Sequence, residues 1–140
     1  MVNVAVVGCG RWGMNYVRVF EELSGARVDW AFDKDELCLK RLVHRFPTVK
    51  AARTLKEITR CSDLDAVIVA APASDHYEIV KQCLKAGKHV LVEKPIALTV
   101  EDATEMISLA AEMGKMLMVG HTFIFNSGIR KLKEYIKDES

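Results

Sequence analysis

Val-Asn-Val-Ala-Val-Val-Gly-Cys-Gly-Arg-Trp-Gly occupies residues 2–13, and this stretch decides the fold of the chain. A short apolar run is typical of a buried parallel strand, and this one leads directly into Gly8, Gly10 and Gly13. Apolar residues then recur at helical spacing over residues 14–20, so the glycines lie where a strand passes into a helix. The pattern predicts a dinucleotide-binding turn.

Each glycine has a role in such a turn. Gly8 allows the tight turn, Gly10 leaves the backbone open to a pyrophosphate, and Gly13 lets the helix pack closely on the strand. The anion then meets the free N–H groups and the positive dipole end of the helix. We expect the residues between the glycines to contact the cofactor as well; these are Cys9, Arg11 and Trp12.

An acidic residue stands where this fingerprint requires one. A second strand is predicted over residues 26–32, and Asp33 follows it, 20 residues after Gly13. Its carboxylate can accept hydrogen bonds from the adenosine ribose and repel a 2′-phosphate, which favours NAD over NADP. Lys34, also predicted to lie at the cofactor, weakens that preference. Asp33 can equally cap the next helix, and the two roles are compatible.

Composition limits the class of protein. The chain has 140 residues, half of them apolar, which is enough for one domain with a real core. Twenty basic and nineteen acidic residues leave a net charge of +1, so neither nucleic acid nor an anionic membrane is an expected partner. The longest apolar stretch, residues 66–72, is too short to span a bilayer, and the N-terminus lacks a signal-peptide pattern. We therefore expect a cytoplasmic protein.

The four cysteines, Cys9, Cys38, Cys61 and Cys83, lack the paired spacing of zinc or redox motifs. In the cytoplasm they are expected to be reduced and to serve as small core residues. Cys9 lies near a helix N-terminus, which can activate a thiol. Packing is nevertheless the favoured role of Cys9, since no nearby residue supplies a general base.

Strand and helix patterns alternate along the rest of the chain. Helices are predicted over residues 35–46, from Thr54 to 60, from Ser74 or Asp75 to 87, from Thr99 to 113 and over 127–138; further strands are predicted over 49–52, 65–71, 88–93 and 115–120. Six strands joined by helical crossovers predict a doubly wound parallel sheet of the Rossmann type, with strand order 3-2-1-4-5-6. Its ligand crevice should lie at the carboxyl ends of strands 1 and 4.

Glu93-Lys94-Pro95 leaves the fifth strand at this same edge. Lys94 can hydrogen-bond a substrate hydroxyl and help to move its proton while a hydride leaves for the nicotinamide. The alternative is a solvated lysine in a turn where Pro95 ends strand pairing. Glu93 can orient Lys94 or bind local backbone.

Two other loops reach this edge. Ala71 and Pro72 follow the fourth strand and place backbone beside the predicted nicotinamide site. His76, in the first turn of the next helix, can reach a phosphate, a ribose or a substrate, although a packing role is favoured over catalysis. His121 follows the sixth strand and is predicted to line the crevice or to support it.

These segments together resemble the nucleotide-binding half of the Gfo/Idh/MocA oxidoreductases, across essentially the whole chain. The resemblance rests on Val-Val-Gly-Cys-Gly-Arg-Trp-Gly (6–13), Ala-Ala-Pro-Ala-Ser-Asp-His (70–76), Ala-Gly-Lys-His-Val-Leu-Val-Glu-Lys-Pro (86–95) and Val-Gly-His-Thr-Phe-Ile-Phe-Asn (119–126). It implies that Lys94 is the catalytic lysine, that the three glycines hold the pyrophosphate and that Asp33 binds the ribose. It also implies that Pro72, His76 and Glu93 face the cofactor.

Members of this family continue into a second α+β domain that holds the substrate, and we expect that domain to be absent from residues 1–140. We therefore expect residues 1–140 to be the dinucleotide-binding domain of an NAD-dependent oxidoreductase, and the isolated chain to lack turnover. The expected substrate is a secondary alcohol or ketone of a sugar, cyclitol or nucleotide sugar, and the full-length enzyme is expected to form a homo-oligomer. The alternative is a free-standing module that senses NAD or a nucleotide sugar without turnover.

Overall fold

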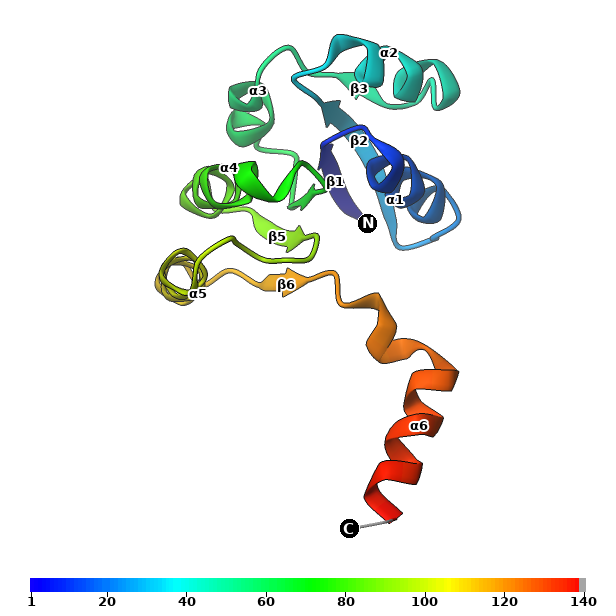
Figure 1. The fold of residues 1–140 in the computed structure, drawn as a ribbon. Helices are drawn as coiled ribbons and strands as arrows, with labels where there is room; N and C mark the ends of the chain where they lie inside the picture. Colours follow the sequence, from blue (N-terminus) through cyan, green and yellow to red (C-terminus); the bar gives the residue numbers. More distant parts are fainter. Residues whose placement is uncertain (139–140) are drawn as a thin grey trace.

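The computed structural model describes residues 1–138, and a single six-stranded sheet organises them (Figure 1). The strands are β1 (Val2–Val7), β2 (Ala26–Phe32), β3 (Lys50–Ala51), β4 (Ala66–Val69), β5 (His89–Val92) and β6 (Leu117–Val119). All neighbouring pairs are parallel, and the order is β3-β2-β1-β4-β5-β6. This confirms the predicted doubly wound sheet and its reversal between β1 and β4.

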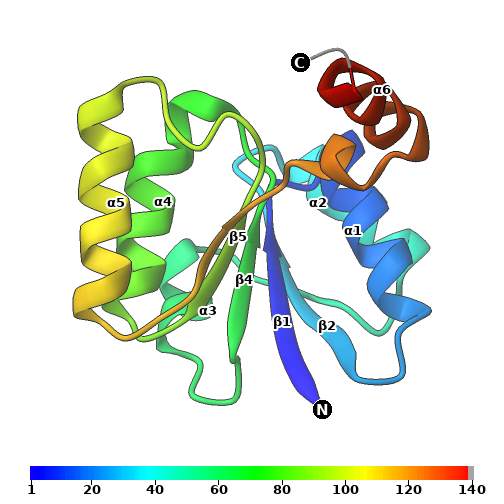
Figure 2. The same cartoon turned by 90° about the horizontal axis from the view of Figure 1, so that it is seen from below.

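Helices cover both faces of the sheet (Figure 2). One face carries α1 (Arg11–Glu21) and α2 (Glu36–Arg45); the other carries α3 (Leu55–Arg60), α4 (Ala73–Lys85) and α5 (Val100–Glu112). Along β1, Val4 and Val6 pack with the first pair of helices, whereas Ala5 and Val7 pack with the other three. Burial on both faces explains why this strand is a continuous apolar run.

β3 and α4 differ from the predictions in their bounds, and the structure also tests the predicted caps of α3 and α5. β3 has two residues instead of four, and α4 begins at Ala73 because Pro72, with φ −56°, occupies its N-cap in place of Ser74 or Asp75. Thr54 stands at the N-cap of α3, but its side chain makes no capping bond; the Glu57 carboxylate instead accepts a hydrogen bond from the Arg53 N–H at 3.1 Å. The predicted cap of α5 is confirmed, since the Thr99 hydroxyl accepts from the N–H of Asp102.

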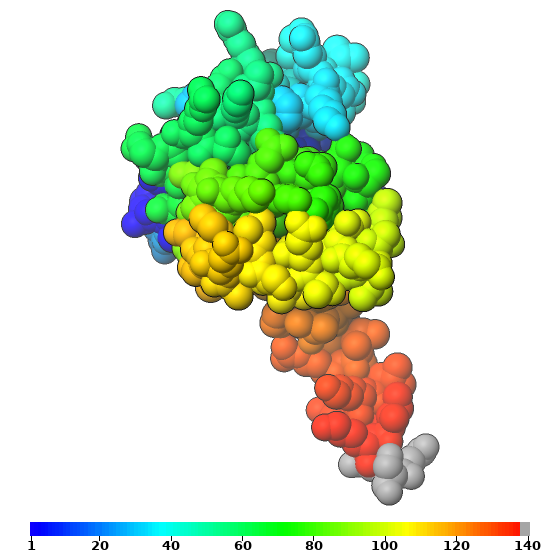
Figure 3. Space-filling model, turned by 90° about the vertical axis from the view of Figure 1, so that its left-hand side faces the viewer, coloured from blue at the N-terminus to red at the C-terminus, as the bar shows by residue number. Residues whose placement is uncertain are grey.

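The last segment leaves the sheet. A short 3₁₀ helix, η1 (Thr122–Phe125), was not predicted, whereas α6 (Ser127–Asp138) has the predicted bounds. Figures 1 and 3 show α6 extending away from the sheet and its helices. Apolar side chains on η1 and α6 are exposed, among them Phe123 at 70% and Ile136 at 62%. Of the helices that the structure describes, none has the length and apolar character needed to span a membrane.

The core between the sheet and α4 can be tested with Leu84, whose side chain is fully buried. Leu84→Ala is expected to lower the free energy of unfolding by about 2–5 kcal/mol, because it removes apolar contacts and leaves a cavity. Leu98→Ala, at a site that is 67% exposed, is the control and should change it by no more than about 0.5 kcal/mol. Urea denaturation followed by circular dichroism measures both values, and equal losses would contradict this packing.

Candidate functional site

The glycine turn between β1 and α1 is crowded at two of its three glycines. Gly8 has φ +96°, and a Cβ there would lie 2.5 Å from the carbonyl carbon of Ala70. A Cβ on Gly13 would collide with the carbonyl oxygen of Gly8. The loops after β1 and β4 therefore touch, and α1 packs directly on the turn, as predicted for these two glycines.

Gly10 is open instead of crowded. A Cβ on Gly10 would meet no atom of the described chain within 4 Å, so the space in front of this backbone is free. Gly10 is also the N-cap of α1; no side chain caps this helix and no acidic residue occupies its first turn. The first N–H groups of a helix have no intrahelical acceptor, and Arg11 adds a positive charge beside them. This turn therefore fits a pyrophosphate.

The Asp33 carboxylate joins the glycine turn to the start of α2. Its Oδ2 accepts a hydrogen bond from the Cys9 N–H at 2.6 Å, and its Oδ1 accepts one from the Asp35 N–H at 2.8 Å. The N-cap of α2 is Asp35, whose side chain accepts from the Leu37 N–H, so Asp33 orders the approach to the helix without capping it. Each carboxylate oxygen keeps a lone pair with which it can accept a ribose hydroxyl.

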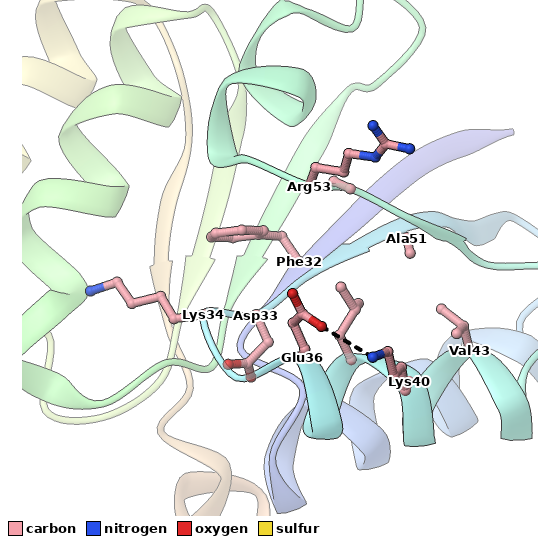
Figure 4. Close-up of a pocket in the computed structure, with 10 residues that line it drawn as sticks. Phe32, Asp33, Lys34, Glu36, Lys40, Val43, Ala51 and Arg53 are labelled. Carbon is pink, nitrogen blue, oxygen red and sulfur yellow. Dashed lines mark hydrogen bonds and ion pairs between the residues drawn. The ribbon is translucent and has the colours of Figure 1, made fainter.

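Two adjoining hollows meet at Asp33 and form a groove along the carboxyl edge of the sheet. A pocket of about 160 Å³ lies between the β1 and β4 loops and is lined by Gly8, Asp33, Ala71 and Pro72 among others. A larger pocket of about 570 Å³ continues from Asp33 toward β3 (Figure 4). Both share Phe32, Asp33 and Lys34. The predicted crevice is thus present and extends to the end of β3.

Three cations line the larger pocket, and two of them have acidic partners. Lys34 extends away from its centre in Figure 4, with its Nζ 3.0 Å from the Asp75 carboxylate, and Lys40 pairs with Glu36 at 3.1 Å. Arg53 directly follows Ala52, and its contribution to this pocket was not predicted. The only signal available in the sequence was its place at the end of the predicted third strand.

His76 joins two loops at this edge. Its side chain is 1% exposed, with Nδ1 2.8 Å from the carbonyl oxygen of Pro95 and Nε2 2.8 Å from that of Ala71. Each ring nitrogen faces a main-chain carbonyl, so the ring lies between the Lys94 loop and the Ala71–Pro72 loop. Carbonyls only accept, so the ring donates to both of them when it is protonated and to one of them when it is neutral. This geometry agrees with the favoured packing role of His76 and leaves no ring nitrogen for a cofactor.

Lys94 is exposed at this edge, and its peptide bond to Pro95 is cis. Within residues 1–138 its ammonium group makes no hydrogen bond or ion pair, so it can bind a substrate oxygen. Glu93, by contrast, is 6% exposed; its Oε1 accepts the Tyr16 hydroxyl at 2.6 Å and its Oε2 accepts the Lys94 N–H at 3.2 Å. The contact between Tyr16 and Glu93 was not predicted, since helical spacing alone assigned Tyr16 to the core.

The remaining candidates lie beside the groove. Trp12 is 47% exposed and lines a separate hollow with Tyr16 and Thr122, whereas Arg11 and His121 are exposed. His121 precedes η1 and does not line the pockets that meet at Asp33. A cofactor contact through His121 therefore stays a prediction.

Cys9 is a packed residue of the turn. It is 3% exposed, and burial together with the neighbouring Asp33 charge raises the pKa of its thiol to about 12. A thiol that stays protonated at neutral pH is a poor nucleophile, which agrees with the packing role. No group of three or more potential metal ligands occurs within the part of the chain that the structure describes.

The parallel sheet, the open glycine turn and Asp33 define a dinucleotide-binding domain of the Rossmann type. The family model described as "Oxidoreductase family, NAD-binding Rossmann fold" matches residues 2–121, so the chain belongs to the Gfo/Idh/MocA oxidoreductase family.

Named relatives agree with this assignment. Inositol 2-dehydrogenase 1 of Mycolicibacterium vanbaalenii is 33% identical over 137 residues, which cover 96% of this chain and 40% of that protein. GenD2 from gentamicin A biosynthesis, solved with NAD, has 32% identity and a TM-score of 0.90, with 96% of this chain and 38% of that chain covered. The 3-ketoreductase KijD10 of Actinomadura kijaniata, solved with NADP, has 27% identity and a TM-score of 0.89, with 98% and 42% covered. The chain thus spans about two fifths of the length of these proteins.

Burial of Cys9 can be tested by thiol labelling. Cys9 and Cys83, whose thiol pKa burial also raises to about 12, should resist maleimide in the folded chain, whereas the half-buried Cys38 and Cys61 should react first. Peptide mass spectrometry after timed labelling measures each rate, and labelling in urea shows that all four thiols can react. Early modification of Cys9 would contradict the packing role.

Proposed function

We propose that this chain is the dinucleotide-binding domain of a cytoplasmic NAD-dependent oxidoreductase that acts on a secondary alcohol, or the corresponding ketone, of a sugar, cyclitol or nucleotide sugar. The observation that carries the proposal is the position of the buried His76 ring between two loops. The ring lies within hydrogen-bond distance of Pro95, in the loop of Lys94, and of Ala71, in the loop that lines the groove beginning at the glycine turn. The Lys94 ammonium group, which has no partner within residues 1–138, and the groove therefore lie at one edge of the sheet, which supports a dinucleotide site there.

In the proposed reaction, a bound nicotinamide accepts or supplies the hydride. Lys94 hydrogen-bonds the reacting oxygen of the substrate and assists the transfer of its proton. The exposure of Lys94 and its lack of a partner within residues 1–138 suit that task. Glu93 is held by Tyr16 and by the Lys94 N–H, which supports an orienting role and not that of a general base.

The preference for NAD over NADP rests on Asp33. Its carboxylate lies where the two pockets meet, and its charge would oppose a 2′-phosphate. Lys34, the cation next in sequence, is paired with Asp75, which reduces its ability to offset that repulsion. Arg11 and Trp12 are proposed to flank the pyrophosphate, and His121 to lie near the nicotinamide.

Substrate contacts are proposed to come from a second α+β domain, as the greater length of the relatives suggests. The catalytic protein would then be longer than these 140 residues, and we propose that it forms a homo-oligomer. A sensor that binds NAD or a nucleotide sugar without turnover is the rival function. Lys94 favours the enzyme, because a sensor needs the glycines and Asp33 but no lysine beside the hydride site.

Cofactor binding is tested by calorimetric titration of the chain with NADH. Gly10→Glu should weaken binding about a hundredfold or more, because its side chain fills the open space before the turn and its charge repels the pyrophosphate. Gly25→Glu is the matched control, since Gly25 also has open space around it but lies in the turn before β2. NADPH should bind about tenfold more weakly than NADH. Equal binding by wild type and Gly10→Glu would refute the assigned site.

Turnover separates the enzyme from the sensor. In the full-length protein, with NAD and a panel of cyclitols and sugars, Lys94→Ala should lower kcat by about 10²–10⁴-fold and leave the affinity for NADH within about twofold. Lys85→Ala, which removes an exposed lysine at the C-terminal end of α4 and thus at the opposite edge of the sheet, should change neither value. The reaction is followed by the absorbance of the NADH that forms from NAD. Full activity of the Lys94→Ala variant would exclude a catalytic role for Lys94.

A further inference from the structure

Lys94 owes its position to its neighbours in the chain. Its ammonium group has no partner within residues 1–138. The position of the Lys94 main chain, which depends on the residues before and after it, therefore determines where the side chain can reach. The carbonyl of Pro95 is held by His76, which fixes the following residue. The preceding residue, Glu93, is held by a residue of α1, whereas His76 belongs to α4.

Glu93 is a buried carboxylate that two hydrogen bonds hold. One comes from the Tyr16 hydroxyl at 2.6 Å, and the other comes from the N–H of Lys94 itself at 3.2 Å. None of the ion pairs within the described residues includes Glu93, so these donors are what stabilise its charge. Burial and the bond to Glu93 raise the pKa of Tyr16, which keeps its hydroxyl protonated as the donor.

Gly120, the residue after β6, lies against the hydrogen bond between Tyr16 and Glu93. A Cβ on Gly120 would lie 3.0 Å from the Tyr16 hydroxyl oxygen and 3.1 Å from Glu93 Oε1. Such distances are tighter than ordinary contacts, so the two side chains would have to shift. The small residue at position 120 therefore preserves the hydrogen bond between them.

Tyr16 lies one helical turn after Gly13, on the helix whose N-terminus forms the open glycine turn. The bond to Glu93 thus connects the element that would carry the pyrophosphate with the residue that precedes Lys94. We propose that Tyr16 is a positioning residue for Lys94, which sets its backbone relative to the glycine turn through Glu93. This inference rests on the proposed role of Lys94, but its first test does not require a cofactor.

The first test is amide hydrogen exchange of the ¹⁵N-labelled, cofactor-free chain. Tyr16→Phe keeps the ring and removes the hydroxyl, and it should speed exchange of the Lys94 amide by about two- to tenfold, the range expected for one hydrogen bond. Tyr77→Phe is the matched control, because the Tyr77 hydroxyl donates to Glu105 at the same 2.6 Å but joins α4 to α5. The Tyr77→Phe variant should leave the exchange rate of the Lys94 amide unchanged.

A second variant covers the case in which Tyr16→Phe does not fold. Gly120→Ala should also speed exchange of the Lys94 amide by pushing the Tyr16–Glu93 pair apart, whereas Gly25→Ala, with open space at its Cβ, should not. An unchanged Lys94 rate in folded Tyr16→Phe overturns the proposal. If that variant is unfolded, an unchanged rate in Gly120→Ala overturns it.

The second test uses NADH as the probe and follows the Lys94 amide resonance. In Tyr16→Phe, NADH should bind within about twofold of the wild-type affinity, while the shift it induces at Lys94 should fall by at least about half, a split that a general loss of stability would not produce. A full shift in that variant contradicts the positioning role. If the wild-type chain binds no NADH, the proposed function fails, and the exchange measurements still decide the role of Tyr16.

Discussion

Close backbone packing at Gly8 is the constraint on which the rest of the site depends. A Cβ there would overlap the backbone of Ala70, so the loops after β1 and β4 can touch only because this residue has no side chain. Gly13 then brings α1 down onto the turn. That approach points the N-terminus of α1 into the crevice, where its unpaired N–H groups can meet an anion. It also carries Tyr16 to within hydrogen-bond distance of Glu93.

Three polar side chains connect the loops at the carboxyl edge of the sheet. Asp33 fixes the Cys9 amide in the glycine turn, His76 ties the loop after β4 to Pro95, and Glu93 connects α1 to the backbone of Lys94. His76 and Glu93 are almost fully buried, and each bonds to backbone as well as crossing between elements. Burial makes such bonds costly to break, which favours one arrangement of the loops. A dinucleotide in the groove would meet a surface that is already ordered.

The fold could be predicted because its signals are local. The alternation of short apolar runs with helical patterns predicted all six strands. It also placed Asp33 at the end of a strand that lies beside the glycine turn, where its carboxylate accepts from the Cys9 N–H. Two local details differed from the predictions. Pro72 occupies the N-cap of α4, so this helix begins before Ser74, and Thr54 takes the predicted N-cap position of α3 without a side-chain capping bond, while Glu57 accepts from the Arg53 N–H. The contacts of Tyr16 and Arg53 could not be found in the sequence, since they depend on packing between distant segments.

The central claim is that a nicotinamide dinucleotide lies along the carboxyl edge of the sheet with its phosphates at the glycine turn. The most direct measurement is a titration of the ¹⁵N-labelled chain with NAD, followed by amide chemical shifts. The account predicts the largest changes at residues 8–13, with further changes at Asp33, at Ala71 and around Lys94. Shifts confined to the opposite edge of the sheet, around Lys88 and Lys115, or no saturable shift at all, would contradict it.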